Sequence, residues 1–192
     1  MVRLLEFDET EALTAATDAF RRLGYSGVSI KTLEAETGLS SGSIYNSFGS
    51  KDAVFTRVMR HYNDTVVEKR ISTHLEGAKP VAGLIALFES LLDEPDDGAF
   101  GCLLTNSAIE FAGSDADAVA EIRRGFERFI SAFNSTLVSL NGDDPVTVQR
   151  TSLRLLTYYQ GLLVLIRHGY DKTALRDTIK SEIKDITGEF DA

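Results

Sequence analysis

Apolar residues recur at helical spacing along most of the chain, and no segment keeps the alternation of apolar and polar residues that a half-buried strand requires. Proline occurs only three times in 192 residues, so helices are seldom interrupted. The pattern predicts an all-α protein of about nine helices, in which three short helices precede a long fourth helix over 51–75.

Small polar residues and glycines mark the ends of the first helices. A helix that begins near Asp8 is expected to end at Gly24, because glycine readily takes the left-handed conformation that closes a helix. Ser29, Ser40 and Ser50 each precede a helical pattern, and a serine there can accept a hydrogen bond from the first free amides. Helices two, three and four therefore follow one another closely.

Five more helices are predicted in the rest of the chain. They are expected over 81–93, 100–112, 115–140, 146–168 and 172–188. Asp144 followed by Pro145 is a strong start signal for the fourth of them, since proline has no N–H to lose in the first turn and the carboxylate accepts from free amides.

The segment GLSSGSIYNSFGSK, residues 38–51, is too polar for a core helix and too aromatic for a linker. A short helix, a tight connection at Gly38 and a second short helix have the layout of a helix-turn-helix. The residues expected to face the first helix are Leu33, Leu39, Ile44 and Phe48. The opposite face would present Ser41, Gly42, Ser43, Asn46 and Ser47. Small polar side chains of this kind let a helix approach base edges and phosphates, which predicts a helix that enters a groove of DNA.

Residues 8–60, and above all GYSGVSIKTLEAETGLSSGSIYNSFGSKDAVF, resemble the DNA-binding region of the TetR family of bacterial transcriptional regulators. The positions that match its pattern are Gly24, Ser29, Ile30, Leu33, Gly38, Leu39, Ser40, Gly42, Ile44, Tyr45, Phe48 and Lys51. The remainder is similar in helix count, and GCLLTNSAIEFAG is similar to one branch of these regulators.

The resemblance implies a helix-turn-helix DNA-binding domain over 1–50 and a ligand-sensing and dimerisation domain over 51–192. Family members bind palindromic operators as dimers, and most repress until a small molecule binds the C-terminal domain. The resemblance implies phosphate contacts by Tyr45 and Lys51, further backbone contacts by Thr32 and Ser40, and base contacts by Ser41, Ser43 and Asn46. Gly42 is also a candidate DNA-binding residue, because a small residue on this face lets the helix come close to DNA.

Three positions depart from the family pattern. Glu34 stands where many members have alanine, Ser47 stands where histidine or tyrosine often precedes the phenylalanine, and only Arg3 represents the basic N-terminal arm. The net charge is −9, although residues 1–60 carry seven Lys and Arg against eight Asp and Glu, so most of the acidic excess lies farther along the chain. We therefore expect few phosphate contacts and DNA affinity that salt weakens easily.

Beyond residue 52 the helices carry more large apolar residues than one core-facing stripe needs. The plain interpretation is an ordinary core. The alternative is a mostly apolar cavity among the fourth to eighth helices that takes a small apolar or amphipathic molecule. Its candidate contacts are Met59, Tyr62, Phe88, Cys102, Asn106, Phe126, Phe129 and Tyr158. Further polar candidates are Thr105, Tyr159 and Gln160.

Other chemistry finds little support in the sequence. Cys102 is the only cysteine, so it forms no disulfide within the chain, and it is either a small buried hydrophobe or a redox-sensing thiol. The three histidines show no metal-binding spacing, and no catalytic or nucleotide-binding motif is present. We expect no metal, no cofactor and no enzymatic activity. With no signal peptide and no apolar run of roughly 18 residues, a soluble cytoplasmic protein is expected.

The last two helices are expected to form a dimer surface. Residues 152–170, SLRLLTYYQGLLVLIRHGY, are apolar nearly all round, and Leu175, Ile179, Ile183 and Ile186 repeat on one face of the next helix. Two such helices from each subunit would form a four-helix bundle. Two functional alternatives stay open, a helical ligand-binding protein or enzyme without DNA binding and a protein-interaction module.

Overall fold

The computed structural model describes residues 7–94, 100–112, 117–141 and 144–188. In chain order its elements are α1 (Glu9–Gly27), α2 (Ile30–Thr37), α3 (Ser41–Phe48), α4 (Lys51–Tyr62), the π-helical segment η1 (Asn63–Val67), α5 (Glu68–Leu75), α6 (Pro80–Glu89), α7 (Leu103–Glu110), α8 (Asp117–Asn141), α9 (Pro145–Arg167) and α10 (Lys172–Thr187). Because α4, η1 and α5 follow without a break, the described residues form nine helical stretches and no strand, which confirms the all-α prediction.

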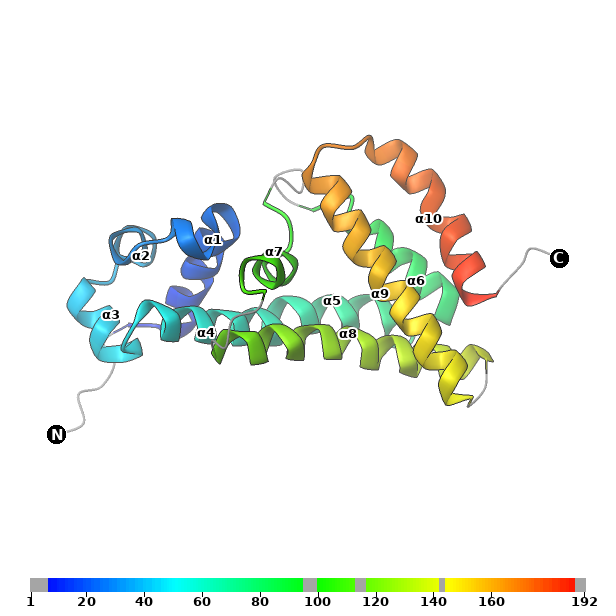
Figure 1. Cartoon of the computed structure of the whole chain (residues 1–192), viewed down its shortest axis with the longest axis horizontal. Coiled ribbons are helices and arrows are strands. Elements are labelled where there is room, and N and C mark those ends of the chain that lie inside the picture. The colour runs from blue at the N-terminus through cyan, green and yellow to red at the C-terminus, as the bar shows by residue number, and fades with distance from the viewer. Residues whose placement is uncertain (1–6, 95–99, 113–116, 142–143, 189–192) are drawn as a thin grey trace. The chain divides into compact units, whose positions relative to one another are not determined.

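The chain divides into two compact units. Unit 1 comprises Met1–Val66 and Cys102–Arg124, and unit 2 comprises Val67–Gly101 and Gly125–Ala192. Unit 1 contains α1 to α4, α7 and the start of α8, while unit 2 contains α5, α6, most of α8, α9 and α10 (Figure 1).

Capping side chains start the helices where the sequence predicts. Ser29, Ser40 and Ser50 each accept a hydrogen bond from an amide in the first turn of the following helix, and Asp144 does the same for α9. Gly24 has a φ of 72°, so the predicted end of the first helix is a kink, after which one turn continues to Gly27. The helices predicted over 81–93 and 100–112 are shorter in the structure, since α6 ends at Glu89 and α7 begins at Leu103.

Aromatic rings fill the core of unit 1. Phe20 of α1 and Phe55 of α4 meet edge to face with ring centroids 4.8 Å apart, and Phe111 stacks on Phe55 at 5.1 Å. Val58 and Met59, which follow Phe55 in α4, are also fully buried. Large apolar side chains therefore hold α1 and the end of α7 against α4.

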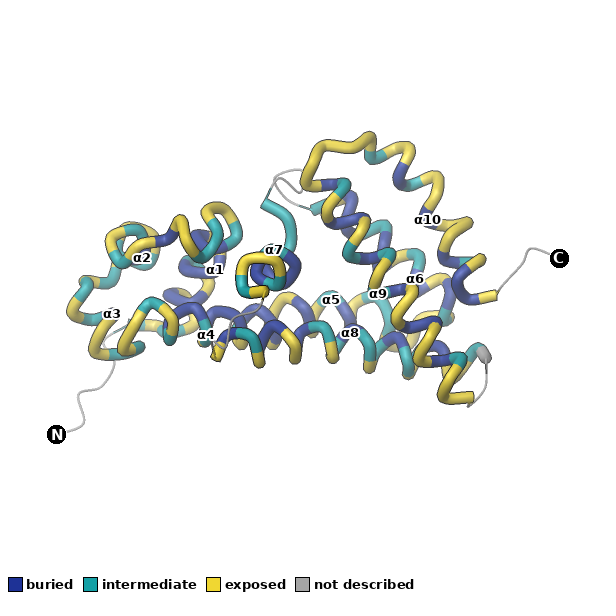
Figure 2. Tube along the Cα trace, viewed as in Figure 1, coloured by how far each residue is buried: buried dark blue, intermediate teal, exposed yellow. Residues whose placement is uncertain are grey.

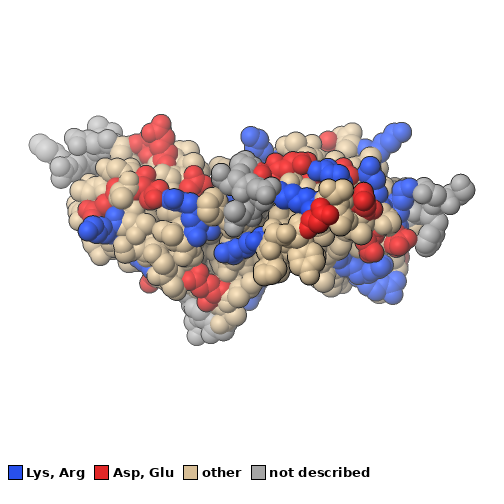
Figure 3. Space-filling model, turned by 90° about the horizontal axis from the view of Figure 1, so that it is seen from above, with Lys and Arg blue, Asp and Glu red and all other residues tan. Residues whose placement is uncertain are grey.

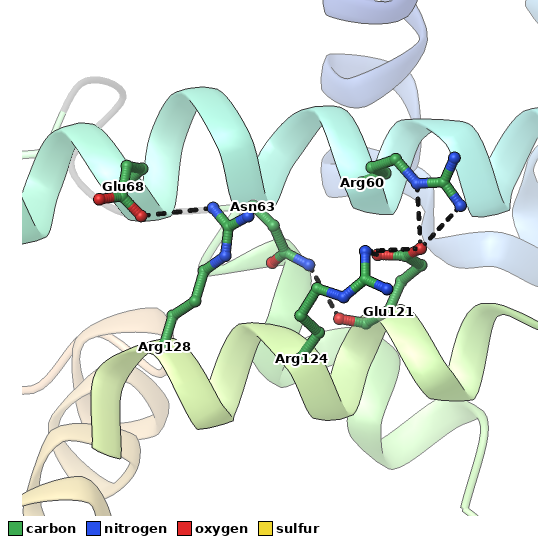
Figure 4. Close-up of polar contacts among 6 residues, drawn as sticks. All are labelled: Arg60, Asn63, Glu68, Glu121, Arg124 and Arg128. Atoms are coloured by element: carbon green, nitrogen blue, oxygen red, sulfur yellow. Dashed lines mark hydrogen bonds and ion pairs between the residues drawn. The ribbon is translucent and has the colours of Figure 1, made fainter. Parts of the chain in front are cut away.

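Polar contacts in unit 1 join α4 and η1 to α8. The side-chain amide of Asn63 donates to the backbone carbonyl of Glu121 at 2.8 Å, and Figure 4 shows Arg60 and Arg124 both reaching the Glu121 carboxylate.

Unit 2 has its own core, built from α6, α8, α9 and α10. Buried residues recur every third or fourth position along α9, from Val148 to Ile166 (Figure 2). Phe88 of α6 and Phe133 of α8 are completely buried. The stripe of α10 formed by Leu175, Ile179, Ile183 and Ile186 is also buried, and α10 packs against α6 and α9.

Candidate functional site

The turn between α2 and α3 is fixed by short polar side chains. Ser29 and Thr32 form a capping box at the start of α2, and Gly38 ends α2 with a φ of 71°. The Thr37 hydroxyl accepts from the Leu39 amide at 3.2 Å, and the Ser40 hydroxyl accepts from the Ser43 amide at 3.2 Å. The chain therefore reverses between the two helices within three residues.

The inward faces of α2 and α3 pack on α1. Leu33 and Ile44 are almost completely buried, and Leu39 and Phe48 are half-buried. The apolar neighbours that line this junction with them include Ala12, Leu13, Ala16 and Val54. The four residues expected to hold the helix pair together thus lie on one side of it.

The outward face of α3 is polar and open. Tyr45 is 52% exposed, Gly42 and Asn46 are exposed, and Ser41 and Ser43 are half-exposed. A Cβ built on Gly42 would meet only the Ser40 hydroxyl, at 3.8 Å. Nothing within the protein therefore requires glycine at this position. The eight residues of α3 include no charged side chain.

The other two candidates, Lys51 and Thr32, lie outside α3, at the start of α4 and in α2. The Lys51 ammonium is 4.1 Å from the centre of the Tyr25 ring, and the Tyr25 hydroxyl donates to the Asp52 carboxylate. Burial lowers the pKa of Lys51, although the Glu110 carboxylate partly opposes this shift. The Thr32 hydroxyl accepts from the Ser29 amide at 3.2 Å, so it already takes part in the capping box.

Two carboxylates to which the sequence analysis gave no role bind backbone amides of the helix-turn-helix region. Glu34 of α2 accepts from the Ser41 amide, the first of α3, at 2.6 Å. Glu110 of α7 accepts from the amides of Tyr25 and Ser26 at 2.8 and 2.7 Å, directly after the Gly24 kink. The departure of Glu34 from the family pattern was the only signal for the first. Nothing in the sequence links Glu110 to residues 85 positions earlier.

Charges of both signs are mixed around the helix-turn-helix. Glu36 of α2 pairs with Arg22 at 2.6 Å, and Glu9 pairs with Arg57 at 2.5 Å. Basic and acidic side chains are likewise interspersed on the face of the molecule in Figure 3. The basic arm expected from Arg3 lies outside the described residues.

The sequence model described as "Bacterial regulatory proteins, tetR family" matches residues 12–58, which contain this whole helix-turn-helix. Residues 12–58 therefore form a DNA-binding region of the TetR family. The HTH-type transcriptional repressor DhaR of Mycobacterium sp. (strain GP1) is 28% identical over 136 residues, which cover 70% of this chain and 66% of DhaR. The uncharacterised HTH-type regulator YezE of Bacillus subtilis (strain 168) is 26% identical over 75% of this chain and 78% of its own length.

Solved TetR-family structures share the fold over nearly the whole chain. SCO4454 from Streptomyces coelicolor superposes with a TM-score of 0.80 at 15% identity, covering 93% of each chain. A cysteine mutant of the TetR-family regulator CifR, complexed with 26-bp double-strand operator DNA, gives a TM-score of 0.76 at 22% identity and covers 98% of this chain and all of that one.

Four of the candidate effector contacts lie in unit 1. Met59 is fully buried and accepts a weak hydrogen bond from the Ser107 hydroxyl, with oxygen and sulfur 3.7 Å apart. The Tyr62 hydroxyl lies 3.4 Å from the Cys102 sulfur, and Asn106 is half-buried on α7. Polar and apolar groups are thus interleaved where α4 meets α7.

The other four candidates lie in unit 2. Phe88 stacks on Tyr158 with centroids 5.5 Å apart and meets the ring of Tyr159 edge to face at 5.4 Å. Phe129 approaches Tyr159 at 4.8 Å. The fourth, Phe126 of α8, is half-buried. Unit 2 therefore contains an aromatic cluster around Tyr159, whose hydroxyl accepts from Arg70 at 3.4 Å.

The Tyr158 hydroxyl is shielded from solvent with no hydrogen-bond partner of good geometry among the described residues. Burial raises the pKa of Tyr158, and the Glu182 carboxylate raises it further, while the nearby Thr178 hydroxyl acts in the opposite direction. A buried phenol without a good partner is costly, so this group is available to a ligand that can accept its hydrogen bond.

The expected dimer surface needs one correction. Leu175, Ile179, Ile183 and Ile186 do not face a partner subunit, because α6 and α9 of the same chain cover them. The exposed apolar residues of this region are instead on α9, where Val146, Leu153 and Val164 are 72%, 48% and 52% exposed. A groove of about 970 Å³ runs along α9 and reaches Glu182 and Ile186 of α10.

Within the described ranges no helix is long and apolar enough to cross a bilayer. The same residues include no group of three or more His, Cys, Asp or Glu side chains that could hold a metal ion.

Proposed function

We propose that this protein is a ligand-responsive transcriptional repressor that binds a near-palindromic operator as a homodimer and is released from it by a small apolar or amphipathic molecule. The observation that carries the proposal is α3, a capped helix with a charge-free outer face of small polar residues, inside the region matched by the TetR family. A helix with that face fits the major groove, where hydroxyl and amide groups read base edges.

The proposed roles within the DNA-binding region follow the family pattern. Residues 1–50 bind DNA, and residues 51–192 sense the effector and form the dimer. Phosphate contacts are proposed for Thr32, Ser40, Tyr45 and Lys51. Base contacts are proposed for Ser41, Ser43 and Asn46, with Gly42 allowing close approach. Phosphate contacts fix the register of the protein on the duplex, whereas base contacts select the sequence.

The named relatives support this assignment. DhaR is described as a repressor, and the CifR mutant structure is a complex with operator DNA. The open space at Gly42 among the described residues and the exposure of Tyr45 and Asn46 support the same role in this chain.

The proposed dimer interface is formed by the last two helices, chiefly by the exposed apolar residues Val146, Leu153 and Val164 of α9. Burial of such residues against a second copy gains roughly 25 cal/mol per Å² of apolar surface. An isologous interface of this kind makes a two-fold dimer, which is the symmetry that a palindromic operator requires.

The proposed effector contacts are Met59, Tyr62, Cys102 and Asn106 in unit 1 and Phe88, Phe126, Phe129 and Tyr158 in unit 2. The Tyr158 hydroxyl is proposed to donate a hydrogen bond to the effector. A ligand that moves the dimer from about 99:1 to 1:99 between its two states must bind one state about 5.5 kcal/mol more tightly. This is within the range of a well-fitted apolar ligand. The proposed role includes no chemical step, and a regulator of this kind acts in the cytoplasm, where its operator is.

The proposal is tested by selecting duplexes from a random pool with the purified protein and measuring their mobility shifts at low salt. A discrete complex that survives excess shuffled competitor is expected. If no duplex gives a discrete complex even at low salt, the DNA-binding function is wrong.

A further inference from the structure

The backbone amide of Ser41, the first residue of α3, is already bound by a carboxylate. Glu34 reaches across the α2–α3 turn and accepts from the Ser41 N–H at 2.6 Å. The other side chains that tie this turn, Thr37 and Ser40, are neutral hydroxyls. Charge-assisted hydrogen bonds are roughly twice as strong as neutral ones, so Glu34 makes the strongest of the polar contacts that tie this turn to α3.

The same carboxylate occupies the Ser41 amide, which could otherwise bind a DNA phosphate. Free amides at a helix N-terminus bind phosphate, because they point outward and the helix dipole favours negative charge there. Glu34 forms no ion pair within the part of the chain that the structure describes. The α3 segment supplies no cation to offset its charge. A backbone phosphate near Ser41 would therefore meet a carboxylate instead of a free donor.

We propose that Glu34 is a positioning and specificity-determining residue for DNA recognition: it holds α3 through the Ser41 amide and keeps backbone phosphate away from that amide. The inference rests on the proposed function. Its consequence is that non-specific affinity is lowered, since that affinity comes almost entirely from phosphate contacts. A larger share of operator affinity must then come from base contacts by the α3 side chains.

Two substitutions separate the two effects. Glu34→Gln keeps an oxygen that can accept from Ser41 but removes the charge, so operator and shuffled duplexes should both bind roughly fivefold more tightly at low salt, with their ratio nearly unchanged. Glu34→Ala removes both. Shuffled DNA should again bind more tightly, but the ratio of operator to shuffled affinity should fall roughly tenfold because α3 is less well oriented.

Glu36→Gln is the matched control. It makes the same charge change two residues farther along α2, but Glu36 pairs with Arg22 and binds no amide of α3. The affinity ratio should be unchanged in this variant. A loss of discrimination as large as that of Glu34→Ala would overturn the inference, since any acidic residue of α2 would then serve equally well.

Hydrogen exchange of the Ser41 amide in the DNA-free protein provides an independent readout. Exchange should be slow in the wild type, slightly faster in Glu34→Gln and much faster in Glu34→Ala, at equal global stability. If the wild type selects an operator but Glu34→Ala changes neither this exchange nor the affinity ratio, the role of Glu34 is wrong while the proposed function stands. If the wild type selects no duplex, the proposed function fails and this inference fails with it.

Discussion

The guanidinium of Arg60 donates two hydrogen bonds to a single carboxylate oxygen of Glu121, from Nε at 3.0 Å and from a terminal nitrogen at 2.9 Å. The Glu121 side chain is only 4% exposed, while that of Arg60 is 57% exposed. Arg124 adds a contact to the other carboxylate oxygen at 3.0 Å. A buried carboxylate is tolerated only when it is paired in this way, so Glu121 ties α4 to α8 within unit 1.

Replacing Glu121 by alanine should lower the free energy of unfolding by about 2 kcal/mol, because the charge-assisted hydrogen bonds are lost and a buried gap remains. Urea denaturation followed by circular dichroism measures the change. Arg124→Ala is the control and should cost less than about 1 kcal/mol, since that arginine is half-exposed and Arg60 still pairs with Glu121. Equal losses in the two variants would contradict the account.

Lys51 and Asn46 should affect DNA binding in different ways. Lys51→Ala should weaken binding to all sequences alike and reduce the log–log salt slope by roughly 0.9, the value of one phosphate contact. Asn46→Ala should relax the choice of base at one operator position, at a cost of about 1–3 kcal/mol. Salt titrations on the selected duplex and its single-base variants measure both effects. Lys180→Ala on α10 makes the same charge change as Lys51→Ala and should leave the slope unaltered.

Gly42→Ala should separate stability from function. The space around this position is open, so alanine should stabilise α3 by up to about 1 kcal/mol through its better helix propensity. The added methyl group lies on the face that is proposed to approach DNA, so operator binding should nevertheless weaken, and Gly42→Leu should weaken it further. If thermal stability and operator affinity rise together, the close approach proposed for α3 is incorrect.

Leu153→Glu should dissociate the dimer. A carboxylate placed in an apolar interface is desolvated without a partner, so the dimer dissociation constant should rise by roughly 100-fold. Sedimentation velocity across a concentration series measures this change. Ile109→Glu is the control, because Ile109 is 71% exposed on α7 but lies outside the proposed interface. Dimers that persist in Leu153→Glu would place the interface elsewhere.

His74 should make the stability depend on pH. Burial lowers the pKa of His74 below its usual value, and the positive charge of Arg70 lowers it further. The unfolded chain then binds more protons than the folded one, so the free energy of unfolding should fall as the pH drops below about 6.5. His74→Gln should reduce this fall in urea titrations between pH 5 and 8, whereas His168→Gln should behave as the wild type.

Local signals in the sequence were sufficient for much of the fold. Ser40 and Asp144 cap their helices as predicted, because capping depends on residues two or three positions apart. The alternation of small and large residues in α3 likewise predicted which face packs inward. The periodic apolar residues of α10 were assigned to the dimer surface, but α6 and α9 cover them, because periodicity identifies the apolar face of a helix and not the element that covers it.

Contacts between distant segments could not be foreseen. Glu110 binds the amides after the Gly24 kink across about 85 positions, and no local pattern marks such a pair. Glu34 was visible only as a departure from the family pattern, and its contact with Ser41 depends on the geometry of the turn. The π-helical segment at Asn63–Val67 has no sequence signature either, since its residues read as part of one regular helix.

Two copies of α3 are proposed to read successive major grooves of one operator. Hydroxyl-radical footprinting of the protein on its selected duplex measures this arrangement. We expect a near-palindromic site with two protected half-sites whose centres lie roughly 34–36 Å apart, or a multiple of that distance. A single protected patch without two-fold symmetry, or protection that Asn46→Ala and Gly42→Leu leave unchanged, would contradict it.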